Sequence, residues 1–457
     1  MEQEIERSLA VSVSGGGHRA SLFGLGALMY LVDAGANAHV TSIASVSGGS
    51  ITNAFVGQTL DFRTTDGASF TKTVASPLAT QIAKRGTLFA PILTKLYLLV
   101  IIIGAVLVFV PLVKEWGNWY LRLLAFVLSL AVWGWVFGKR GVLCGHAYQK
   151  TLFSPTGRPT LLSQLNRNGI DHVICAAELR SAVQVCFSGS FVYSYWHGHG
   201  EPDDLGLARA VQASACFPGG FPPARFPAKR HKFTGAPTQA GGPSVPPKDL
   251  VMSDGGVYDN MGDQWARGFE QRVEHWPELG HGRKAPNQLV VVNASGRVPW
   301  KPFRQRILPL IGEIAALLRV NDVMYINTTN VRRRDIVENY NPNSPSAATK
   351  LPGALIQITQ SPFVVAEKFA PTAGPAGPRA QAALLLLGNT KKEWDELAKE
   401  NATVSTTLKK LGVDVSTRLI YHGYVLTMCN LHVIFGKEFP LLSGAEIAHD
   451  RFRKLVS

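Results

Sequence analysis

The sequence predicts an α/β fold with a mostly parallel central sheet, interrupted by an inserted pair of apolar helices. Short apolar runs alternate with stretches of helical spacing near the N-terminus, and two long apolar stretches lie between residues 96 and 137. Alternation of strand, turn and helix is typical of parallel sheets whose faces are covered by helices. Of the 457 residues, 46% are hydrophobic and 17% are charged, which supplies a sizeable core and argues against a disordered chain.

The first 60 residues contain two strand–turn–helix units. Residues 9–13 form a short apolar run that ends at a glycine-rich turn, and residues 19–33 then show the spacing of a helix. Residues 40–46 form a second apolar run, which ends at Ser47 and precedes another helical stretch. Two consecutive units of this kind predict parallel strands with helices on the sheet faces.

Two apolar stretches in the middle of the chain differ from this pattern. Residues 96–113 carry no charged side chain before Lys114, and residues 119–137 carry only Arg122. Each approaches the roughly 20 residues that a helix needs to cross a bilayer, and tryptophan and tyrosine cluster near the ends. We expect a transmembrane helical hairpin that turns at residues 114–118. The alternatives are a helical pair buried in a large core, or a hairpin that lies in one leaflet.

The charges around the hairpin predict its orientation. The turn holds one lysine and one glutamate, whereas both flanks are basic. The positive-inside rule then places both flanks, and the main domain with them, in the cytoplasm. We expect a membrane protein with two spanning helices and its catalytic domain on the cytoplasmic side. The basic flanking residues are Lys84, Arg85 and Lys95 before the hairpin and Lys139 and Arg140 after it.

Strand and helix patterns return after the hairpin. Segments rich in proline and glycine predict surface loops at residues 227–248 and 370–381. Residues 383–457 are expected to be mainly helical around an apolar stretch at 421–435. The other expected elements are strands at 173–177, 183–187, 250–252 and 289–293, and a helix at 208–215.

The hairpin divides the predicted α/β domain into two parts. Residues 1–92 would form its first part, and residues 139–300 its second. Residues 93–138 would form the hairpin insertion, and residues 301–457 a C-terminal, mainly helical region.

The net charge of +14 favours an anionic partner. Because the basic residues are scattered, with Arg332–Arg334 as one of the longest runs, we expect a membrane surface and no nucleic acid; a solvated basic surface is the alternative. The five cysteines form no C-x-x-C pair and show no zinc-ligand spacing. We therefore expect free thiols and neither a metal nor another cofactor.

A glycine-rich turn, residues 15–19 (GGGHR), lies between the first strand and the first helix. Backbone N–H groups of such a turn can converge on negative charge, and glycine permits the close approach. An oxyanion or a phosphate would fit. The spacing of Gly15, Gly17 and Ala20, with Asp33 downstream, also fits a dinucleotide-binding fingerprint, so a dinucleotide-binding oxidoreductase is one alternative.

Residues 45–49 (SVSGG) place Ser47 where a strand passes sharply into a helix. A nucleophile at such a turn needs small neighbours two residues away on either side, because the backbones crowd there. Ser45 stands where the usual G-x-S-x-G pattern has its first glycine, and it is small enough for the turn. A serine that only caps the helix is the structural alternative.

Residues 253–256 (SDGG) follow a short apolar strand. This placement predicts Asp254 at the carboxyl edge of the sheet, where open α/β sheets bind ligands. As a general base, Asp254 could take the proton of Ser47 directly. An aspartate that only closes a turn is the alternative.

In this order, the three segments resemble the patatin-like phospholipase family. Residues 213–218 (ASACFP) and 254–260 (DGGVYDN) look like that family as well, and the likeness covers roughly residues 8–92 and 140–300. The resemblance implies a patatin-like three-layer sandwich and a membrane-anchored lipid acyl hydrolase acting on phospholipid or another lipid ester. It also implies a Ser–Asp dyad rather than a triad.

The resemblance further implies a role for each matching residue. Ser47 would attack an ester carbonyl and form an acyl-enzyme, with Asp254 as general base. Backbone N–H groups of the glycine loop would hold the oxyanion, and the arginine after the loop would brace it or meet a lipid phosphate. The implied supporting residues are Gly15, Gly16 and Gly17 for the oxyanion, and Arg19, Gly48, Gly255 and Gly256 around the substrate.

Two further alternatives remain. A catalytically inactive membrane scaffold with the same fold is suggested by Ser45. A Ser-His-Asp triad would need a histidine, which in α/β-hydrolases follows the aspartate. His18 precedes Ser47 but lies in the oxyanion segment, where it could contact substrate. The histidines after Asp254, none of which lies in a recognisable motif, are His275, His281, His422, His432 and His449.

Overall fold

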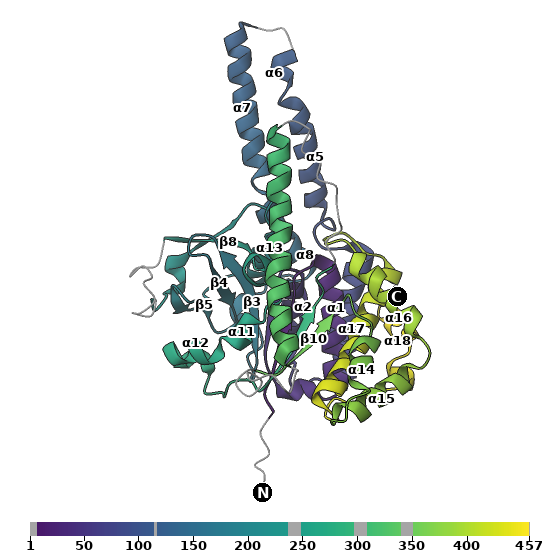
Figure 1. Cartoon of the computed structure of the whole chain (residues 1–457). Helices are drawn as coiled ribbons and strands as arrows, with labels where there is room; N and C mark the ends of the chain where they lie inside the picture. Colours follow the sequence, from purple (N-terminus) through teal and green to yellow (C-terminus); the bar gives the residue numbers. More distant parts are fainter. Residues whose placement is uncertain (1–6, 114–116, 236–247, 297–308, 340–350, 457) are drawn as a thin grey trace.

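Helices pack on both faces of a single sheet, and a pair of helices stands away from this body as a stalk (Figure 1). Neighbouring residues of the central strands point into different hydrophobic cores, as Val11 and Ala10 do. The molecule thus has the three layers of an α/β sandwich, as predicted. The computed structural model describes residues 7–113, 117–235, 248–296, 309–339 and 351–456.

One half of the sheet is parallel. Its strands are β1 (Leu9–Val13), β2 (Val40–Val46), β3 (Asp171–Glu178), β9 (Gln288–Asn293) and β10 (Gly353–Gln357). They lie in the order β10-β9-β1-β2-β3. All neighbouring pairs among them are parallel. Their runs of Val, Ile and Leu suit strands that are covered on both faces. The sequence predicts four of these strands but not β10.

The other half is antiparallel, so the sheet is mixed and not mostly parallel as expected. Its strands are β4 (Val183–Phe187), β5 (Val192–Ser194), β6 (Gly198–Gly200), β7 (Ala224–Pro227) and β8 (Asp249–Asp254). β4 and β8 both pair with β3 in the antiparallel sense. The link between β3 and β4 is too short for the crossover that a parallel pair requires.

The helices α1 (Gly17–Asp33) and α17 (Val413–Phe435) form the closest helix pair of the body. Glycines make this approach possible. A Cβ atom on Gly26 would lie 2.1 Å from the carbonyl oxygen of Ile420, and one on Gly423 would lie 2.1 Å from that of Phe23. The C-terminal region therefore packs into the same core as the first helix of the chain.

Most of the remaining expectations for this region agree with the structure. Helices α16 (Lys391–Thr403) and α18 (His449–Val456) flank α17, as the helical prediction for residues 383–457 implies. The expected loop at 370–381 is wrong in its second half, because α15 (Ala376–Leu387) begins there. Its proline lies in the first turn, where a helix tolerates proline. Part of the expected loop at 227–248 lies outside the described residues.

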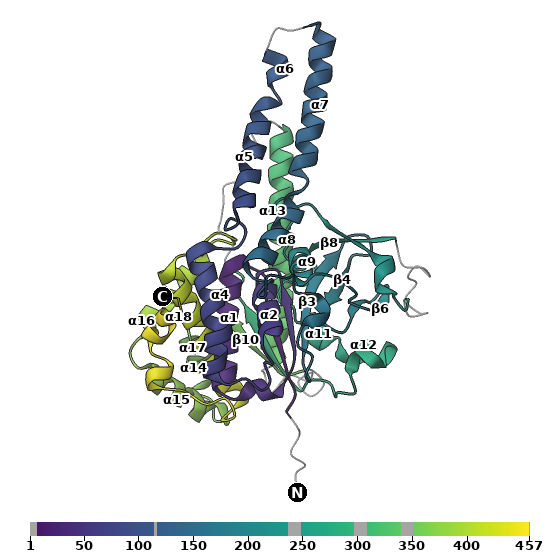
Figure 2. The same cartoon turned by 180° about the vertical axis from the view of Figure 1, so that it is seen from behind.

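The hairpin helices stand clear of the body in both views (Figures 1 and 2). They are α5 (Ile92–Leu107), continued by α6 (Val110–Val113), and α7 (Trp119–Phe137). No residue of α7 is buried, and Thr94 is the single buried residue of α5. Two helices, at 92–113 and 119–151, are long and apolar enough to cross a membrane. A pair buried in a core is thereby excluded. Residues 114–116 of the expected turn lie outside the described residues.

Specific contacts hold the two hairpin helices together. The indole N–H of Trp133 donates to the carbonyl of Ile101 at 3.0 Å, and the hydroxyl of Tyr97 donates to that of Val136 at 2.5 Å. At the base of the stalk, α8 (Arg140–Thr151) leads the chain back into the body. The stalk is therefore a defined helical pair joined to the α/β body at one end.

One long helix that the sequence does not single out is α13 (Pro309–Asn339), with 31 residues. It contacts β10 and the short helix α10 (Gly256–Asp259), which directly follows β8. Both views show its N-terminal half extending from the body in the same direction as the stalk (Figures 1 and 2). This helix thus links β10 to the turn after β8.

The variant Gly423→Ala tests the close packing of α1 and α17. The added methyl group collides with backbone, so we expect the full chain in detergent micelles to lose about 2–3 kcal/mol of unfolding free energy, measured by chemical denaturation. Gly206→Ala is the matched control, because a Cβ atom there meets nothing within 4 Å and φ is −66°. Equal effects of both variants would contradict this packing.

Candidate active site

The strand register brings Ser47 and Asp254 together. β2 ends with Val46 opposite Cys175 of β3, and β8 ends with Asp254 opposite the next residue, Ala176. Because β2 runs parallel to β3 and β8 runs antiparallel to it, the carboxyl ends of β2 and β8 face each other. Asp254 was expected at the carboxyl edge of the sheet; it lies beside the carboxyl end of β2 and reaches Ser47 from an antiparallel strand.

Both side chains line one cavity of about 760 Å³. Its volume is in the range of small-molecule sites. The Ser47 hydroxyl lies beside the Asp254 carboxylate and lowers its pKa. Gly15, Gly16 and Arg19 line the same cavity. No histidine is among the described residues that line it, so the expected alternative of a Ser-His-Asp triad has no histidine in place.

Ser47 has the strained backbone of a nucleophile elbow. Its φ of 50° and ψ of −116° are rare for a residue other than glycine. The Ser47 amide donates to the hydroxyl of Ser214 at 2.9 Å, and that hydroxyl donates to the Cys175 carbonyl at 2.6 Å. Ser214 was not among the expected site residues, although it lies in the ASACFP segment that carries the family resemblance.

The glycines after Ser47 are required by crowding. A Cβ atom on Gly48 would lie 2.0 Å from the carbonyl oxygen of Gly17, and one on Gly49 would lie 2.5 Å from that of Val13. Contacts this short are impossible for a real side chain. Gly48 therefore lets the elbow and the glycine loop touch backbone to backbone.

Ser45 fits the position where the usual pattern has glycine. It is fully buried, and its hydroxyl donates to the Val173 carbonyl at 3.0 Å and accepts from the Asn53 amide at 2.9 Å. Because a buried hydroxyl needs such partners, the departure from the pattern is accommodated without an unpaired group.

Two backbone amides of the glycine loop are left open, and one of them, that of Gly16, belongs to a residue that lines the cavity. The Gly15 amide already donates to the Asn260 carbonyl at 3.0 Å, and the His18 amide donates to the Thr407 carbonyl at 3.0 Å. Gly16 and Gly17, with φ of 140° and 61°, have no acceptor for their amides among the described residues. Of the three glycines expected to hold an oxyanion, Gly15 thus has its amide engaged, whereas the amides of Gly16 and Gly17 are open.

Arg19 braces the loop, which is one of its two expected roles. Its Nε donates to the Ala294 carbonyl at 2.9 Å, and its Nη1 donates to the Val404 carbonyl. Burial lowers the pKa of the guanidinium to about 10. The side chain thereby joins α1 to the segments that follow β9 and α16.

His18 has a structural position, contrary to the expected substrate contact. Its Nδ1 lies 2.8 Å from the Lys409 carbonyl oxygen and its Nε2 lies 2.9 Å from the Thr87 hydroxyl. Burial lowers the pKa of the imidazole to about 4, so the ring is neutral at pH 7. The C-terminal segment around Thr407 therefore holds the glycine loop through His18, and no sequence motif pointed to that segment.

Burial raises the pKa of Asp254 to about 6. Three groups oppose this rise: the Gly256 amide, which donates to Oδ1 at 2.8 Å, and the nearby hydroxyls of Ser47 and Tyr325. A base with a pKa close to the working pH suits proton transfer. The glycine at 256 is required here, since a Cβ atom would lie 2.3 Å from Cε1 of Tyr325. Tyr325 belongs to α13 and was not expected at the site.

Gly255 is required for a different reason. A Cβ atom on Gly255 would lie 2.3 Å from the Cys175 carbonyl oxygen, and its amide donates to the Ser214 carbonyl at 3.1 Å. Both glycines of the expected Asp-Gly-Gly segment thus allow the turn after β8 to press against β3 on one side and α13 on the other.

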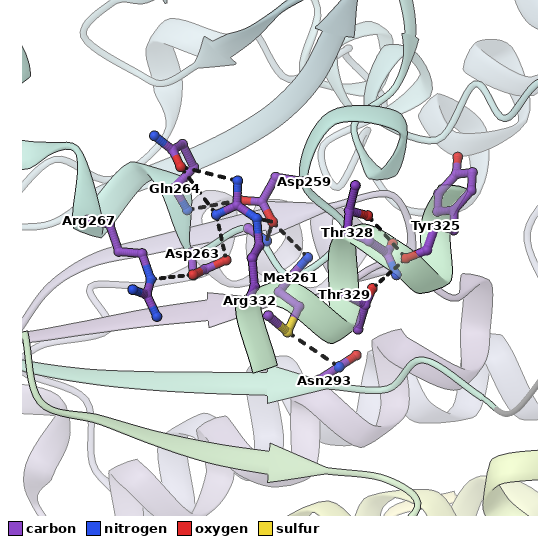
Figure 3. A network of polar contacts seen from close by, with 12 residues as sticks. Asp259, Met261, Asp263, Gln264, Arg267, Asn293, Tyr325, Thr328, Thr329 and Arg332 are labelled. Carbon is purple, nitrogen blue, oxygen red and sulfur yellow. Dashed lines mark hydrogen bonds and ion pairs between the residues drawn. The ribbon is translucent and has the colours of Figure 1, made fainter. Parts of the chain in front are cut away.

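A buried ionic network fixes α13 above this turn (Figure 3). Asp259 accepts backbone hydrogen bonds from Met261 at 3.0 Å and Gln264 at 2.9 Å. Nη1 of Arg332 lies 3.3 Å from Oδ1 of Asp263, and its Nε lies 3.6 Å from Oδ1 of Asp259. Burial and the neighbouring Asp263 raise the pKa of Asp259 to about 6. Arg332 therefore ties α13 to the segment that carries the catalytic candidate.

The raised pKa of Asp254 predicts a pH-dependent cost in stability. The folded chain holds this proton more tightly than the unfolded chain, whose pKa is near 3.8, so unfolding free energy falls as pH rises from about 4 to about 6 and then levels. Asp254→Asn removes this cost. We expect it to gain up to about 3 kcal/mol over the wild type at pH 7, relative to pH 4, in denaturant titrations.

The exposed carboxylate of Asp204 provides the control, since it makes only a surface ion pair with Arg230. Asp204→Asn should follow the wild-type stability at every pH. Parallel stability curves for Asp254→Asn and the wild type would contradict a raised pKa of the buried carboxyl.

The chain has distant similarity to solved structures and matches one family model. Among curated proteins, none matches the chain. Two solved structures align with it: human GIVD cytosolic phospholipase A2, with 11% identity and a TM-score of 0.42, and VipD from Legionella pneumophila, with 13% identity and a TM-score of 0.26. The first alignment covers 100% of this chain and 61% of the human protein; the second covers 99% and 91%.

A family model described as patatin-like phospholipase matches residues 11–262. The matched region is more than half of the 457 residues and includes the glycine loop, the serine elbow and the Asp-Gly-Gly turn. This match confirms the resemblance on which the expectations rested. The chain therefore belongs to the patatin-like phospholipase family.

Proposed function

We propose that this protein is a membrane-anchored lipid acyl hydrolase that cleaves carboxylic esters through a Ser47–Asp254 dyad. The observation that carries the proposal is that Ser47 and Asp254 line one cavity of about 760 Å³, where the Ser47 hydroxyl lies beside the Asp254 carboxylate. Members of the family are lipid acyl hydrolases, which supports this chemistry.

The reaction would proceed through an acyl-enzyme. Ser47 Oγ attacks the ester carbonyl while Asp254 accepts its proton, and the amides of Gly16 and Gly17 stabilise the oxyanion. The leaving alcohol takes the proton back from Asp254 as the C–O bond breaks, which leaves the acyl group on Ser47. Water then attacks this ester while Asp254 takes its proton; Asp254 returns the proton to Ser47 Oγ as the acyl bond breaks, and the fatty acid departs.

The apolar stalk supports membrane attachment. Helices that expose this many apolar residues to water would be unfavourable, and a bilayer would cover them. The basic residues Lys84 and Arg85 before the stalk, and Lys139 and Arg140 after it, favour the cytoplasmic side for the body. Such an anchor would keep the cavity close to phospholipid or other lipid esters.

Neither alternative function gains support from the site. The inactive scaffold was suggested by Ser45, whose hydroxyl is satisfied within an intact elbow. The dinucleotide-binding oxidoreductase leaves Ser47 and Asp254 without a role. The lipid acyl hydrolase accounts for all of these residues.

Ser47→Ala and Asp254→Asn test the dyad on mixed phospholipid vesicles. Each removes a group that forms or breaks a bond in the reaction, so we expect fatty-acid release to fall at least about 1,000-fold at equal protein yield. Ser443→Ala is the control, because this serine is exposed and does not line the cavity. A fluorophosphonate probe should label the wild type and the control but not Ser47→Ala. Full turnover by either dyad variant would refute the mechanism.

Tyr325→Phe tests the electrostatics of the base. The Tyr325 hydroxyl lowers the pKa of the Asp254 carboxyl, so its removal should raise that pKa above about 6. We expect the acidic limb of the kcat/KM profile to move to higher pH by roughly 0.5–1 unit. If Tyr325→Phe lowers the activity but leaves the acidic limb of the kcat/KM profile in place, Tyr325 contributes only packing.

A further inference from the structure

Three consecutive arginines on α13 have three different surroundings. Arg332 is bound to the buried carboxylates of Asp259 and Asp263, as described above. Arg333 and Arg334 are both exposed, but Arg333 lines the cavity that contains Ser47 and Arg334 does not. Successive residues of an α-helix point about 100° apart, so one short run can serve an anchor, a binding site and the solvent.

The face of α13 that carries Arg333 forms one wall of the cavity. Ile326, Thr329, Asn330 and Arg333 line it together with Tyr325. Residues three and four apart share one face of a helix, so this spacing describes a continuous stripe. The anchor at Arg332 fixes the rotation of the helix, and Arg333 is thereby directed to the same space as the nucleophile.

The side chains that line the cavity carry more positive than negative charge. Asp254 is the one carboxylate among the described residues that line it, against the guanidinium groups of Arg19 and Arg333. Arg19 is occupied by the carbonyls of Ala294 and Val404. Within the described parts of the chain, Arg333 has no carboxylate or carbonyl partner. Its hydrogen-bond donors are therefore available to a ligand.

The rest of the wall suits a polar head group beside an acyl chain. The amides of Asn330 and Gln360 and the hydroxyl of Thr359 line the cavity, and so do the apolar side chains of Phe217 and Ile326. A guanidinium group matches two phosphate oxygens at once, which makes arginine the preferred partner of phosphate groups. The overall charge of +14 adds to the attraction for an anionic ligand.

We propose that Arg333 binds the phosphate group of the lipid and makes this site selective for phosphate-bearing lipid esters over neutral glycerides. The inference rests on the proposed hydrolase function and names the substrate class of the same site. Because Arg333 lies on α13, outside the matched residues 11–262, this selectivity belongs to the part of the chain beyond the family model.

Binding without turnover is the first test. Full-length Ser47→Ala in neutral detergent micelles is titrated with an ether-linked alkylglycerol phosphate and with the alkylglycerol of the same chain length, and tryptophan fluorescence reports binding. We expect the phosphate lipid to bind at least tenfold more tightly. Adding Arg333→Gln should remove this difference, Arg333→Lys should keep part of it, and Arg334→Gln should leave it intact.

Competition with inorganic phosphate distinguishes a site for a lipid phosphate from a site for free phosphate. At millimolar concentration it should not displace the alkylglycerol phosphate, because the acyl-side contacts add to the affinity of the lipid. Displacement at equal concentrations would identify a site for free phosphate and would overturn the lipid assignment.

Turnover is the second test. The kcat/KM ratio for lysophosphatidic acid over monoacylglycerol of the same acyl chain should fall at least tenfold in Arg333→Gln, chiefly through KM for the phosphate lipid. Arg334→Gln should keep the wild-type ratio. If Arg333→Gln retains both the binding difference and the ratio, the inference fails while the hydrolase stands. If the wild type cleaves neither ester but binding still depends on Arg333, the hydrolase fails and the phosphate site stands.

Discussion

The carboxyl ends of β2 and β8 meet at neighbouring residues of β3, and the candidate active site depends on this meeting. Val46 pairs with Cys175 and Asp254 pairs with Ala176, so the backbone register itself brings the serine elbow and the aspartate together. A slip of one residue in either strand would turn the side chains to the opposite face of the sheet. The mixed character of the sheet is therefore a condition of the site, because a parallel β8 could not end there.

Backbone strain and the burial of a carboxyl group both destabilise the site, and contacts with the surrounding fold offset them. Ser47 holds a strained backbone, which the hydrogen bond to Ser214 and the contact of Gly48 with Gly17 keep in place. Asp254 is buried at a raised pKa, and the Gly256 amide limits that rise. Strain and desolvation of this kind are typical of functional sites, where the surrounding fold fixes groups in reactive arrangements.

Segments beyond the matched family region complete the site. Thr407 and Lys409 hold the glycine loop through His18, and Val404 holds it through Arg19. From α13, Tyr325 reaches Asp254 while Arg332 anchors the helix. The family core thus supplies the reactive groups of the proposed mechanism, and the C-terminal region supplies their support and one wall of the cavity.

The sequence by itself determined the elements whose signals are local. Residues 9–13 and 40–46, the glycine loop, and the turns at Ser47 and Asp254 could be predicted, because apolar periodicity and small residues at tight turns report backbone requirements within a few positions. The apolar hairpin was predictable for the same reason, since its length and composition suffice.

Only the tertiary structure decided which distant groups meet. That β8 runs antiparallel, that the Gly15 amide is engaged by Asn260, and that Tyr325 and Arg333 face the cavity all follow from packing between segments far apart in the chain. No local pattern encodes such contacts, because a lone tyrosine or arginine on a helix has the same appearance whether it faces water or a binding site. Strand pairing and helix rotation are collective properties of the folded core, and they gave these residues their positions.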